Sequence, residues 1–231
     1  MSLTDKAITR IRELIQSGEL RPGSRLPPEP HLATELGVGR NIMREAVRAL
    51  VAARVLEVRR GSGTYVTSLQ PRLLLEGIGE AVELLQGDTM LELTEVRRLF
   101  EPAATAFAAT RITPRQLAEV KGHLDAMRAA ADDVELLNKH DAAFHRAVIA
   151  ATGNQTLVTV LDGIASRTVR ARVWRGLVDA DAAGQTLLEH EAIYAALVAS
   201  DAFRAQAAAL IHITTTETWL REHLRDDRLE P

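Results

Sequence analysis

Four residues in the second half of the chain have the types and the spacing of a metal site. Asp141 and His145 are four positions apart, so on a helix their side chains lie on one face and can share a ligand. His190 and His212 follow in two later stretches with helical patterning, each next to apolar residues. If the three helices converge, one carboxylate and three imidazoles would form a site for zinc, or alternatively for nickel, manganese or iron, with positions left open for water or an acid.

Spacing alone leaves a second interpretation of these residues open. An Asp and a His four positions apart are common in helices, and an interior histidine is often satisfied by a carbonyl oxygen rather than by a metal. His140 lies about 100° around the helix from Asp141, and the other histidines lack partners at a useful spacing. We therefore interpret four histidines as surface residues: His31, His123, His140 and His223.

A second set of chemically active residues lies near the start of the chain. Residues 37–50 read as a short turn followed by a helix. On this helix Arg40, Asn41, Arg44, Glu45 and Arg48 share one arc at about 100° per residue. The opposite arc is apolar: Ile42, Met43, Ala46, Val47, Ala49 and Leu50. Arginines spaced in this way can present guanidinium groups to guanine edges or phosphates, as a recognition helix does. An ordinary amphipathic surface helix is the alternative.

The elements around this helix are those of a winged helix-turn-helix. A first helix is predicted over residues 4–17, and a second over residues 29–36 ends at Gly37. Two short helices joined by a tight glycine-containing turn form a helix-turn-helix, with Gly39 as the N-cap of the arginine-bearing helix. Residues 55–60 and 64–66 read as two strands around a glycine-rich, basic tip, which predicts a hairpin wing.

The chain from Thr67 on is predicted to be helical throughout. Pro102 should kink one of these helices, because proline removes an intrahelical hydrogen bond. Thr113 and Gln116 form a capping box, while Asp132 or Asp133 and then Asn154 are N-caps. Short connections between consecutive helices are typical of an antiparallel bundle. Seven helices are predicted, the first over residues 71–86 and the others beginning near residues 88, 113, 133, 154, 184 and 201.

Composition agrees with a helical protein in two parts. Hydrophobic residues make up 46% of the 231 residues and aromatic residues 3%, which favours packed helices over sheets. The absence of cysteine excludes disulfides, thiolate metal ligands and cysteine nucleophiles. Residues 1–66 hold 11 Lys and Arg against 7 Asp and Glu, whereas the remainder holds 17 against 24. The basic part is expected to face a polyanion. Neither a secretory signal nor a membrane-length apolar run is found, so we expect a cytoplasmic protein that does not contact a membrane.

The first 66 residues carry a dense set of motifs: Gly18-x-Leu20-x-Pro-Gly23-x-Arg-Leu-Pro27, Leu32-Ala33, Leu36-Gly-Val38, Arg40, Arg44-Glu-Ala46, Leu50 and Gly61-x-Gly-Thr-x-Val66. Through these motifs this part of the chain resembles the winged-helix domain of GntR-family transcription factors. The resemblance implies that Arg40 and Arg44 read bases, and that Arg25, Asn41, Arg48 and Gly63 complete the DNA-contacting set. Pro30 and Gly39 depart from the family, which usually has Arg and Ser or Thr there, in contact with DNA. We expect this domain over residues 1–68 and a helical domain over residues 69–231.

The helical part carries four further motifs: Asp141-x-x-Phe-His145, Gly153-Asn154, Glu189-His190-x-x-Ile193 and His212. Through these motifs it resembles the FCD effector domain of the FadR-like subfamily of these regulators. The resemblance implies that Asp141, His145, His190 and His212 ligate one metal ion inside the bundle. The helix predicted over residues 71–86 suggests the seven-helix form of the domain.

Arg97 and Glu101 allow two interpretations. They are four positions apart on one helix, so they can form an ion pair, which contributes little when it is exposed. The subfamily has a matching Arg-x-x-x-Glu whose arginine often faces the effector, and two parallel hydrogen bonds to a carboxylate would suit that arginine. The resemblance thus implies an effector site that includes Arg97, Glu101 and Asn154.

Together these features predict a mainly α-helical, dimeric transcription regulator, most often a repressor in this family. We expect it to bind an inverted repeat in double-stranded DNA as a homodimer and to respond to a small carboxylate such as a sugar acid or hydroxy acid. A metalloenzyme is the main alternative, because the metal site could activate water. However, residues 190–194 lack the second histidine of a zinc-protease helix, and no phosphate-binding glycine loop is present. A third possibility is a purely structural dimerisation bundle without metal or effector.

Overall fold

The computed structural model describes residues 1–75, 77, 82 and 89–226. The chain divides into two compact units, Met1–Gly77 and Ile78–Pro231. Of the helix predicted over residues 71–86, the first turn is α4 (Pro71–Leu74), and most of the remainder lies outside the described residues.

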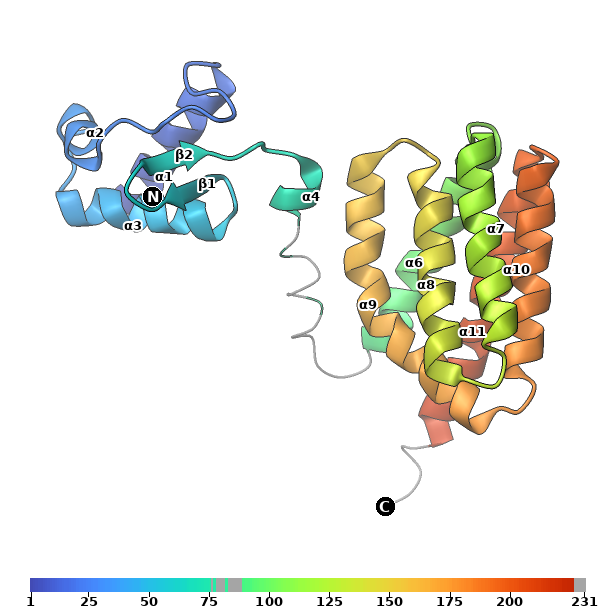
Figure 1. Ribbon diagram of the computed structural model, residues 1–231. Helices are drawn as coiled ribbons and strands as arrows, with labels where there is room; N and C mark the ends of the chain where they lie inside the picture. The colour runs from blue at the N-terminus through green and yellow to red at the C-terminus, as the bar shows by residue number, and fades with distance from the viewer. Residues whose placement is uncertain (76, 78–81, 83–88, 227–231) are drawn as a thin grey trace. The chain divides into compact units, whose positions relative to one another are not determined.

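Residues 3–66 of the first unit form three helices and a two-stranded hairpin, which precede α4 (Figure 1). The helices are α1 (Leu3–Gln16), α2 (Glu29–Glu35) and α3 (Arg40–Ala52), and the strands are β1 (Leu56–Arg59) and β2 (Gly63–Val66). Ser2 and Asp5 form a capping box at the start of α1. The strands pair antiparallel, with Leu56 opposite Val66 and Arg59 opposite Gly63. The predicted winged helix-turn-helix architecture is therefore confirmed.

Backbone conformation explains the tight turn between α2 and α3. Gly37 has a φ of 62°, in the left-handed region that glycine adopts without strain. Gly39 is the N-cap of α3, as predicted, and makes no side-chain hydrogen bond there. Periodicity assigns Ala49 to the buried arc of α3, but Ala49 is exposed, because the core of this unit reaches α3 through other positions. Those core residues include Ile11, Leu14, Leu32, Met43, Ala46, Val47, Leu50, Leu56 and Val66.

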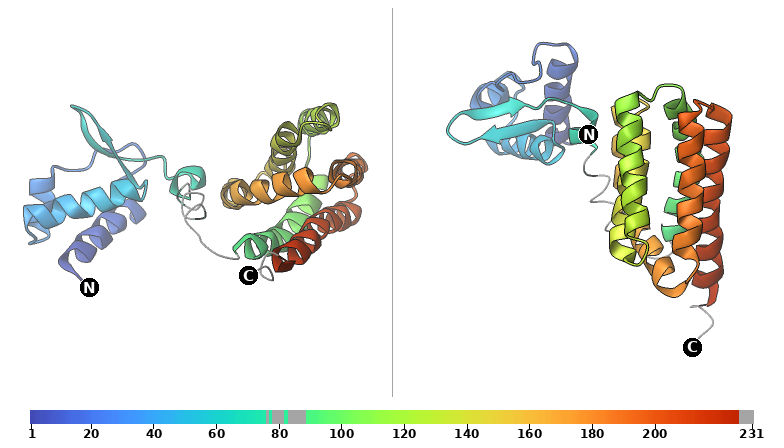
Figure 2. Two further views of the ribbon diagram at one scale, coloured as in Figure 1. Left: turned by 90° about the horizontal axis from the view of Figure 1, so that it is seen from below. Right: turned by 45° about the vertical axis from the view of Figure 1, so that its right-hand side comes forward.

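The second unit is a bundle of long helices that run side by side (Figure 2). Among the described residues its helices are α6 (Thr89–Ala109), α7 (Pro114–Ala129), α8 (Val134–Ala150), α9 (Gln155–Val178), α10 (Ala182–Val198) and α11 (Ala202–Asp226). Its main contacts place α6 against α11, α7 against α8, α8 against α9, and α10 against α11. None of the described helices is long and apolar enough to cross a membrane.

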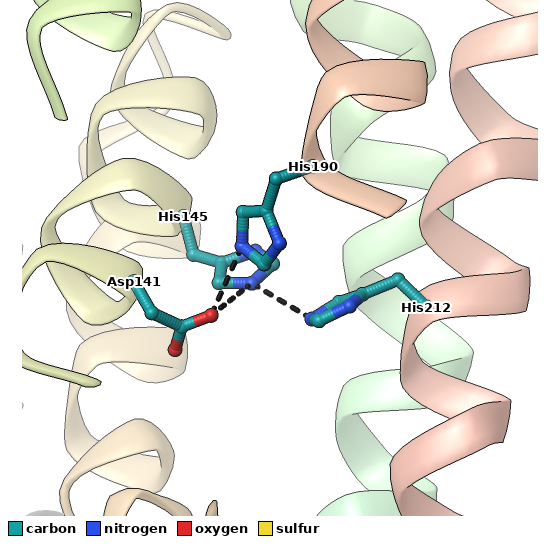
Figure 3. A group of neighbouring side chains, drawn as sticks. All are labelled: Asp141, His145, His190 and His212. Carbon is teal, nitrogen blue, oxygen red and sulfur yellow. Dashed lines mark hydrogen bonds and ion pairs between the residues drawn. The ribbon is translucent and has the colours of Figure 1, made fainter. Parts of the chain in front are cut away.

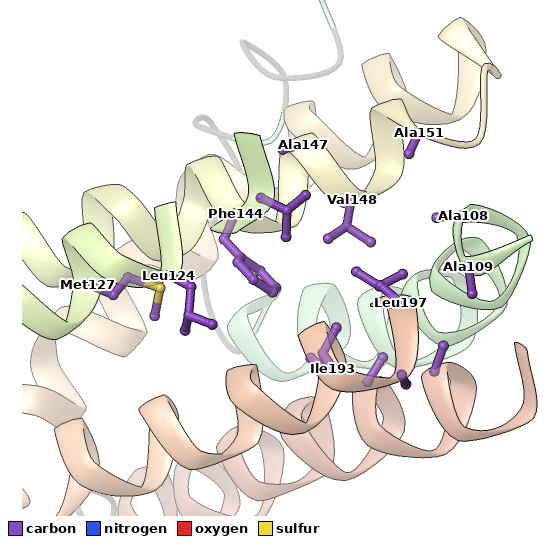
Figure 4. Packing of buried hydrophobic residues seen from close by; sticks show 14 of the residues in the cluster. Ala108, Ala109, Leu124, Met127, Phe144, Ala147, Val148, Ala151, Ile193 and Leu197 are labelled. Carbon is purple, nitrogen blue, oxygen red and sulfur yellow. The ribbon is translucent and has the colours of Figure 1, made fainter. Parts of the chain in front are cut away.

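Local capping signals set most of the helix starts in the bundle. Thr113 and Gln116 form the predicted capping box of α7, Asp133 caps α8, and Asn154 caps α9. Pro102 does not end α6, which continues to Ala109. The centre of the bundle is an apolar cluster around Phe144, Ile193 and Leu197, shown in Figure 4. Phe144 lies on α8 and the other two residues lie on α10, so this cluster joins the helices that carry Asp141, His145 and His190.

Candidate metal centre and nucleic-acid interface

Asp141, His145, His190 and His212 come together inside the bundle (Figure 3). The first two lie on α8, His190 on α10 and His212 on α11. Each offers one ligand atom, and these atoms all lie within 4.8 Å of one another. Asp141, His190 and His212 are buried, and His145 is half-buried. Helix packing thus brings together residues that are up to 71 positions apart in the sequence.

The inner atoms of the four side chains lie at distances typical of ligands around one ion. Asp141 Oδ1 is 2.9 Å from His190 Nε2 and 3.5 Å from His145 Nε2. His145 Nε2 is 3.1 Å from His212 Nε2. Ligand atoms bound at about 2.0–2.1 Å to one metal ion are about 3 Å apart when their bonds form a right angle. The three Nε2 atoms and one carboxylate oxygen therefore face a common point.

Nδ1, the second ring nitrogen of each of these three histidines, has an oxygen acceptor nearby. His190 Nδ1 is 2.7 Å from the Thr186 carbonyl oxygen, and His212 Nδ1 is 2.9 Å from Glu189 Oε2. His145 Nδ1 is 3.5 Å from Glu101 Oε2. Such acceptors favour the tautomer that carries its proton on Nδ1 and leaves the Nε2 lone pair free. All three imidazoles are thereby oriented as metal ligands.

Burial and charge together set the protonation of the site. Burial raises the pKa of Asp141, but Arg172, His145 and His190 outweigh it, so that the pKa lies well below its usual value. Burial lowers the pKa of His145 and, with repulsion from its neighbouring imidazoles, holds the pKa of His212 well below its usual value. The carboxylate is charged and these imidazoles are neutral, and these are the states in which both bind a cation.

The residues fit a divalent cation by a second criterion. Both carboxylate oxygens of Asp141 and Nε2 of His190 are buried without a hydrogen-bond partner in the described part of the chain. Asp141 Oδ1 and His190 Nε2 are close, but their mutual geometry is not that of a hydrogen bond. Buried polar groups without partners are rare in folded proteins, and a cation bound between these two atoms would satisfy both. An Asp and three His form a donor set that suits zinc and other divalent first-row metals.

Two buried arginines lie beside the four residues and differ in how they are held. Arg97 donates to both carboxylate oxygens of Glu101, at 2.5 and 3.1 Å, and to Thr168 Oγ1 at 3.3 Å. Arg172 Nε is 2.9 Å from Asp141 Oδ2, yet none of its nitrogens has a hydrogen bond within the described residues. The donors of Arg97 are therefore engaged inside the protein, whereas those of Arg172 are available to a ligand.

A cavity of about 110 Å³ adjoins this centre. Its lining includes His212, Arg172, Asn138, Thr186 and Thr216, which offer polar groups, together with apolar side chains from α8 and α10. Arg97, Glu101 and Asn154, the residues expected to bind an effector, are not among the lining residues. Asn154 is exposed, and its side chain accepts a hydrogen bond from the backbone of Leu157 at the start of α9.

Sequence reasoning did not identify Arg172 as a residue of this centre. A signal was present, because Arg172 follows Thr168 by one helical turn and shares the inward side of α9 with buried Leu161. A charged residue at an inward position is rare unless it is paired. The four histidines interpreted as surface residues also differ from that expectation, because His31 is the only one of them that is exposed. His123 and His140 are half-buried against each other, and His223 stacks on Trp219.

The arginine-bearing face of α3 is open to solvent. Arg40, Asn41, Arg44 and Arg48 are all exposed. Arg44 makes one long ion pair, at 3.8 Å to Glu29, and this exposed contact contributes little. The face carries three guanidinium groups at successive turns of one helix, as recognition of bases or phosphates requires.

Arg25 and Gly63 lie together near the tip of the hairpin, where Gly63 begins β2 directly after the turn. Arg25 pairs with Tyr65 through its backbone, and its guanidinium lies against Gly63. Gly63 has a φ of 120°, and a Cβ placed there would be 2.8 Å from Arg25 Nε. The left-handed backbone therefore favours glycine at this position, whereas a Cβ would only displace the flexible end of the Arg25 side chain.

Comparison with protein families assigns both parts of the chain. The family model described as bacterial regulatory proteins, gntR family, matches residues 3–66. The model of the FCD domain matches residues 92–215.

Known proteins align with nearly the whole chain. The galactonate operon transcriptional repressor of Escherichia coli K12 is 34% identical over 230 residues, covering 96% of this chain and 98% of the relative. The HTH-type transcriptional regulator LutR of Bacillus subtilis 168 is 32% identical, covering 93% and 99%. The solved structure of a GntR protein from Streptococcus agalactiae superimposes with a TM-score of 0.67 at 29% identity, covering 93% and 99% of the two chains.

Proposed function

This chain belongs to the GntR family of bacterial regulatory proteins and carries an FCD domain, and on that basis we propose a metal-dependent repressor that a small carboxylate releases from DNA. That it is a transcriptional regulator and not an enzyme follows from its family and relatives, which removes the metalloenzyme alternative. DNA is its target, so we place it in the cytoplasm.

The proposed DNA contact uses the exposed face of α3. Arg40 and Arg44 are assigned to base edges, with Asn41 and Arg48 beside them, while Arg25 and Gly63 bring the tip of the wing to the phosphates. Support comes from the exposure of all four α3 side chains and from the net positive charge of residues 1–66. The operator is proposed to be a short inverted repeat, because a symmetric dimer presents two such helices.

The proposed effector site combines the four metal ligands with Arg172 and the adjoining cavity. A bound divalent cation would add positive charge and offer an open coordination position to an anionic oxygen. Arg172 can donate two hydrogen bonds to the same carboxylate from beside the ligands. Asn138, Thr186 and Thr216 line the cavity and can bond to hydroxyl groups of the effector. Arg97 and Glu101 support the site by holding one another and His145 in place.

The class of effector is proposed from the chemistry of this cavity. Cation and guanidinium select a carboxylate, and the polar lining selects a hydroxylated one, which together describe a sugar acid or a hydroxy acid. The name of the galactonate operon repressor, at 34% identity, agrees with a sugar acid. The observation that carries this proposal is the convergence of Asp141, three histidines and an unsatisfied Arg172 beside one cavity.

Ligand binding to the purified, full-length protein tests this site. Zinc should raise the melting temperature of metal-free protein, and galactonate or lactate should raise it further only when zinc is present. Operator DNA selected from a random pool should then be released by the same acid. An acid that binds equally well to metal-free protein would contradict the proposed site.

The proposed dimer packs through one face of α6. Leu99, Phe100 and Phe107 are 61%, 50% and 55% exposed, and exposed Ala103 lies between them. Between Leu99 and Thr110 the only charged residue is Glu101, which is buried, so two copies of this face can meet without placing like charges together. Small Ala103 would let the two helices cross closely at the centre.

Introducing a charged residue into this face of α6 tests the proposed dimer. Phe107→Glu should shift sedimentation from dimer to monomer and weaken binding to an inverted repeat. Leu177→Glu, at an exposed apolar residue of α9, serves as the control because it adds the same charge elsewhere on the bundle. Dissociation by both variants, or by neither, would remove the assignment of the interface to α6.

A further inference from the structure

Glu189 is a buried carboxylate immediately next to a proposed metal ligand in the sequence. It precedes His190 on α10 but points to α11, where Oε2 is 2.9 Å from Nδ1 of His212. Its other oxygen accepts hydrogen bonds from Thr215 Oγ1 at 2.7 Å and from Gln185 Nε2 at 2.8 Å. The side chain is 5% exposed and held at both oxygens. It therefore has a fixed orientation toward His212.

The charges around the centre do not balance without a cation. Glu101 is paired with Arg97, and Asp141 faces Arg172. Within the described residues the partners of Glu189 are His212, Thr215 and Gln185, with no Lys or Arg at ion-pair distance. Burying a carboxylate without a positive partner costs free energy. The centre therefore carries one excess negative charge, on a residue that contacts the proposed ligand His212 and is not itself one of the four ligands.

The three oxygen atoms that contact Nδ1 of His145, His190 and His212 are not equivalent. Thr186 offers a backbone carbonyl one turn before His190, which any residue at that position would provide. Glu101 is 3.5 Å from His145, and its carboxylate is already bound by Arg97. Glu189 alone of the three gives a histidine a side-chain carboxylate that no arginine of the described chain neutralises.

We propose that Glu189 is a positioning residue that sets the metal affinity of the centre through His212. Its carboxylate holds the proton of His212 on Nδ1, turns Nε2 toward Asp141 and raises the basicity of the ring. Its charge is the one that a bound divalent cation compensates. This rests on the proposed function only in taking Asp141, His145, His190 and His212 as metal ligands.

Glu189→Gln tests the inference because it removes the charge and keeps the size. Zinc affinity of the full-length, metal-free protein is measured by competition with a chelator. The variant should bind zinc about 10- to 100-fold more weakly, which is the loss typical when a residue that hydrogen-bonds to a metal ligand is changed. Glu191→Gln on the same helix is the matched control, since Glu191 is exposed and paired with Arg128 away from the centre. It should bind zinc as the wild type does.

Thermal denaturation separates a positioning role from a structural one. Without metal, Glu189→Gln should melt at the wild-type temperature or above it, because an unbalanced buried charge has been removed. With zinc, its rise in melting temperature should be smaller than that of the wild type. A carboxylate that merely ties α10 to α11 would instead lower the melting temperature of both forms.

The ring tautomer of His212 gives an independent measurement. Nitrogen-15 NMR of the metal-free wild type should show His212 protonated on Nδ1, with a larger share of the Nε2-protonated form in Glu189→Gln. If Glu189→Gln binds zinc as tightly as the wild type while His212→Ala does not, the positioning role is wrong and the metal site stands. If the wild type itself binds no zinc, both the metal site and the role of Glu189 are wrong.

Discussion

The two units of this protein hold their arginines in opposite surroundings. On α3, Arg40, Arg44 and Arg48 are exposed, and their positive charge is available to a partner outside the molecule. In the bundle Arg97 and Arg172 are 2% and 7% exposed, and each faces a buried carboxylate. An exposed arginine can be changed with little effect on folding, whereas a buried one is part of a balanced set of charges.

This contrast indicates how each unit would recognise its ligand under the proposed function. The face of α3 would bind DNA by adding charge and hydrogen bonds at regular spacing along one helix. The bundle centre would bind a small acid through the few polar atoms that its internal pairs leave unsatisfied, on Arg172, Asp141 and His190. Changes on α3 should therefore alter DNA binding alone, while changes in the centre should alter metal, effector and stability together.

The largest effect is expected from His212→Ala, which removes a proposed metal ligand. Zinc affinity should fall further than the loss of about 10- to 100-fold that is expected when a residue that only supports a ligand is changed. The stabilisation by zinc should be lost. DNA binding without effector should remain, while release by effector should fail. Zinc content after dialysis and thermal denaturation measure this, with His140→Ala on α8 as the control. Retention of zinc by His212→Ala would show that the four residues do not share one ion.

Arg40→Ala and Arg44→Ala should have the next largest effect, confined to DNA. Each should weaken binding to a specific inverted repeat by about 1–3 kcal/mol and binding to random DNA much less. The melting temperature should not change, because both side chains are exposed. Fluorescence anisotropy on both DNAs measures the difference, with exposed Arg115→Ala in the bundle as the control. Equal losses on specific and random DNA would make these arginines phosphate contacts.

Arg172→Lys and Arg97→Lys distinguish the two buried arginines. Lysine keeps the charge but loses the planar fork, so Arg172→Lys should weaken effector binding by about tenfold. Arg97→Lys should mainly lower stability, because Arg97 donates to Glu101 and Thr168 rather than into the cavity. Calorimetric titration of the zinc-loaded variants measures both. The reverse result would restore Arg97 as the effector-binding residue.

The smallest effect is expected from Gly39→Ser at the start of α3. A Cβ at this position meets no atom within 4 Å, and the backbone is extended, as an N-cap requires. Serine should stabilise the protein by a few tenths of a kcal/mol and can donate a hydrogen bond to a phosphate. Thermal denaturation and DNA titration at low salt measure the change. If DNA binding does not tighten, the N-cap of α3 does not face the duplex.

The sequence by itself determined what depends on local spacing. The helices of the first unit, the capping box at Thr113 and the N-caps at Asp133 and Asn154 lie where residue patterns predicted them. The exposed arc of Arg40, Arg44 and Arg48 also followed from helical periodicity, because about 100° per residue fixes which side chains share a face. The family resemblance added the grouping of Asp141 with the three histidines, which spacing alone left open.

Only the tertiary structure decided which groups are satisfied and which are left for a ligand. Arg97 and Arg172 are both buried in the bundle, and helical spacing does not say that Glu101 takes the donors of one and leaves those of the other. His212 meets Glu189 across 23 residues and His145 across 67. These contacts exist because α10 packs against α11 and because α8 and α11 both pack against α6. The direction in which a helix turns a residue is set locally, whereas the partner it meets is set by the packing of other helices.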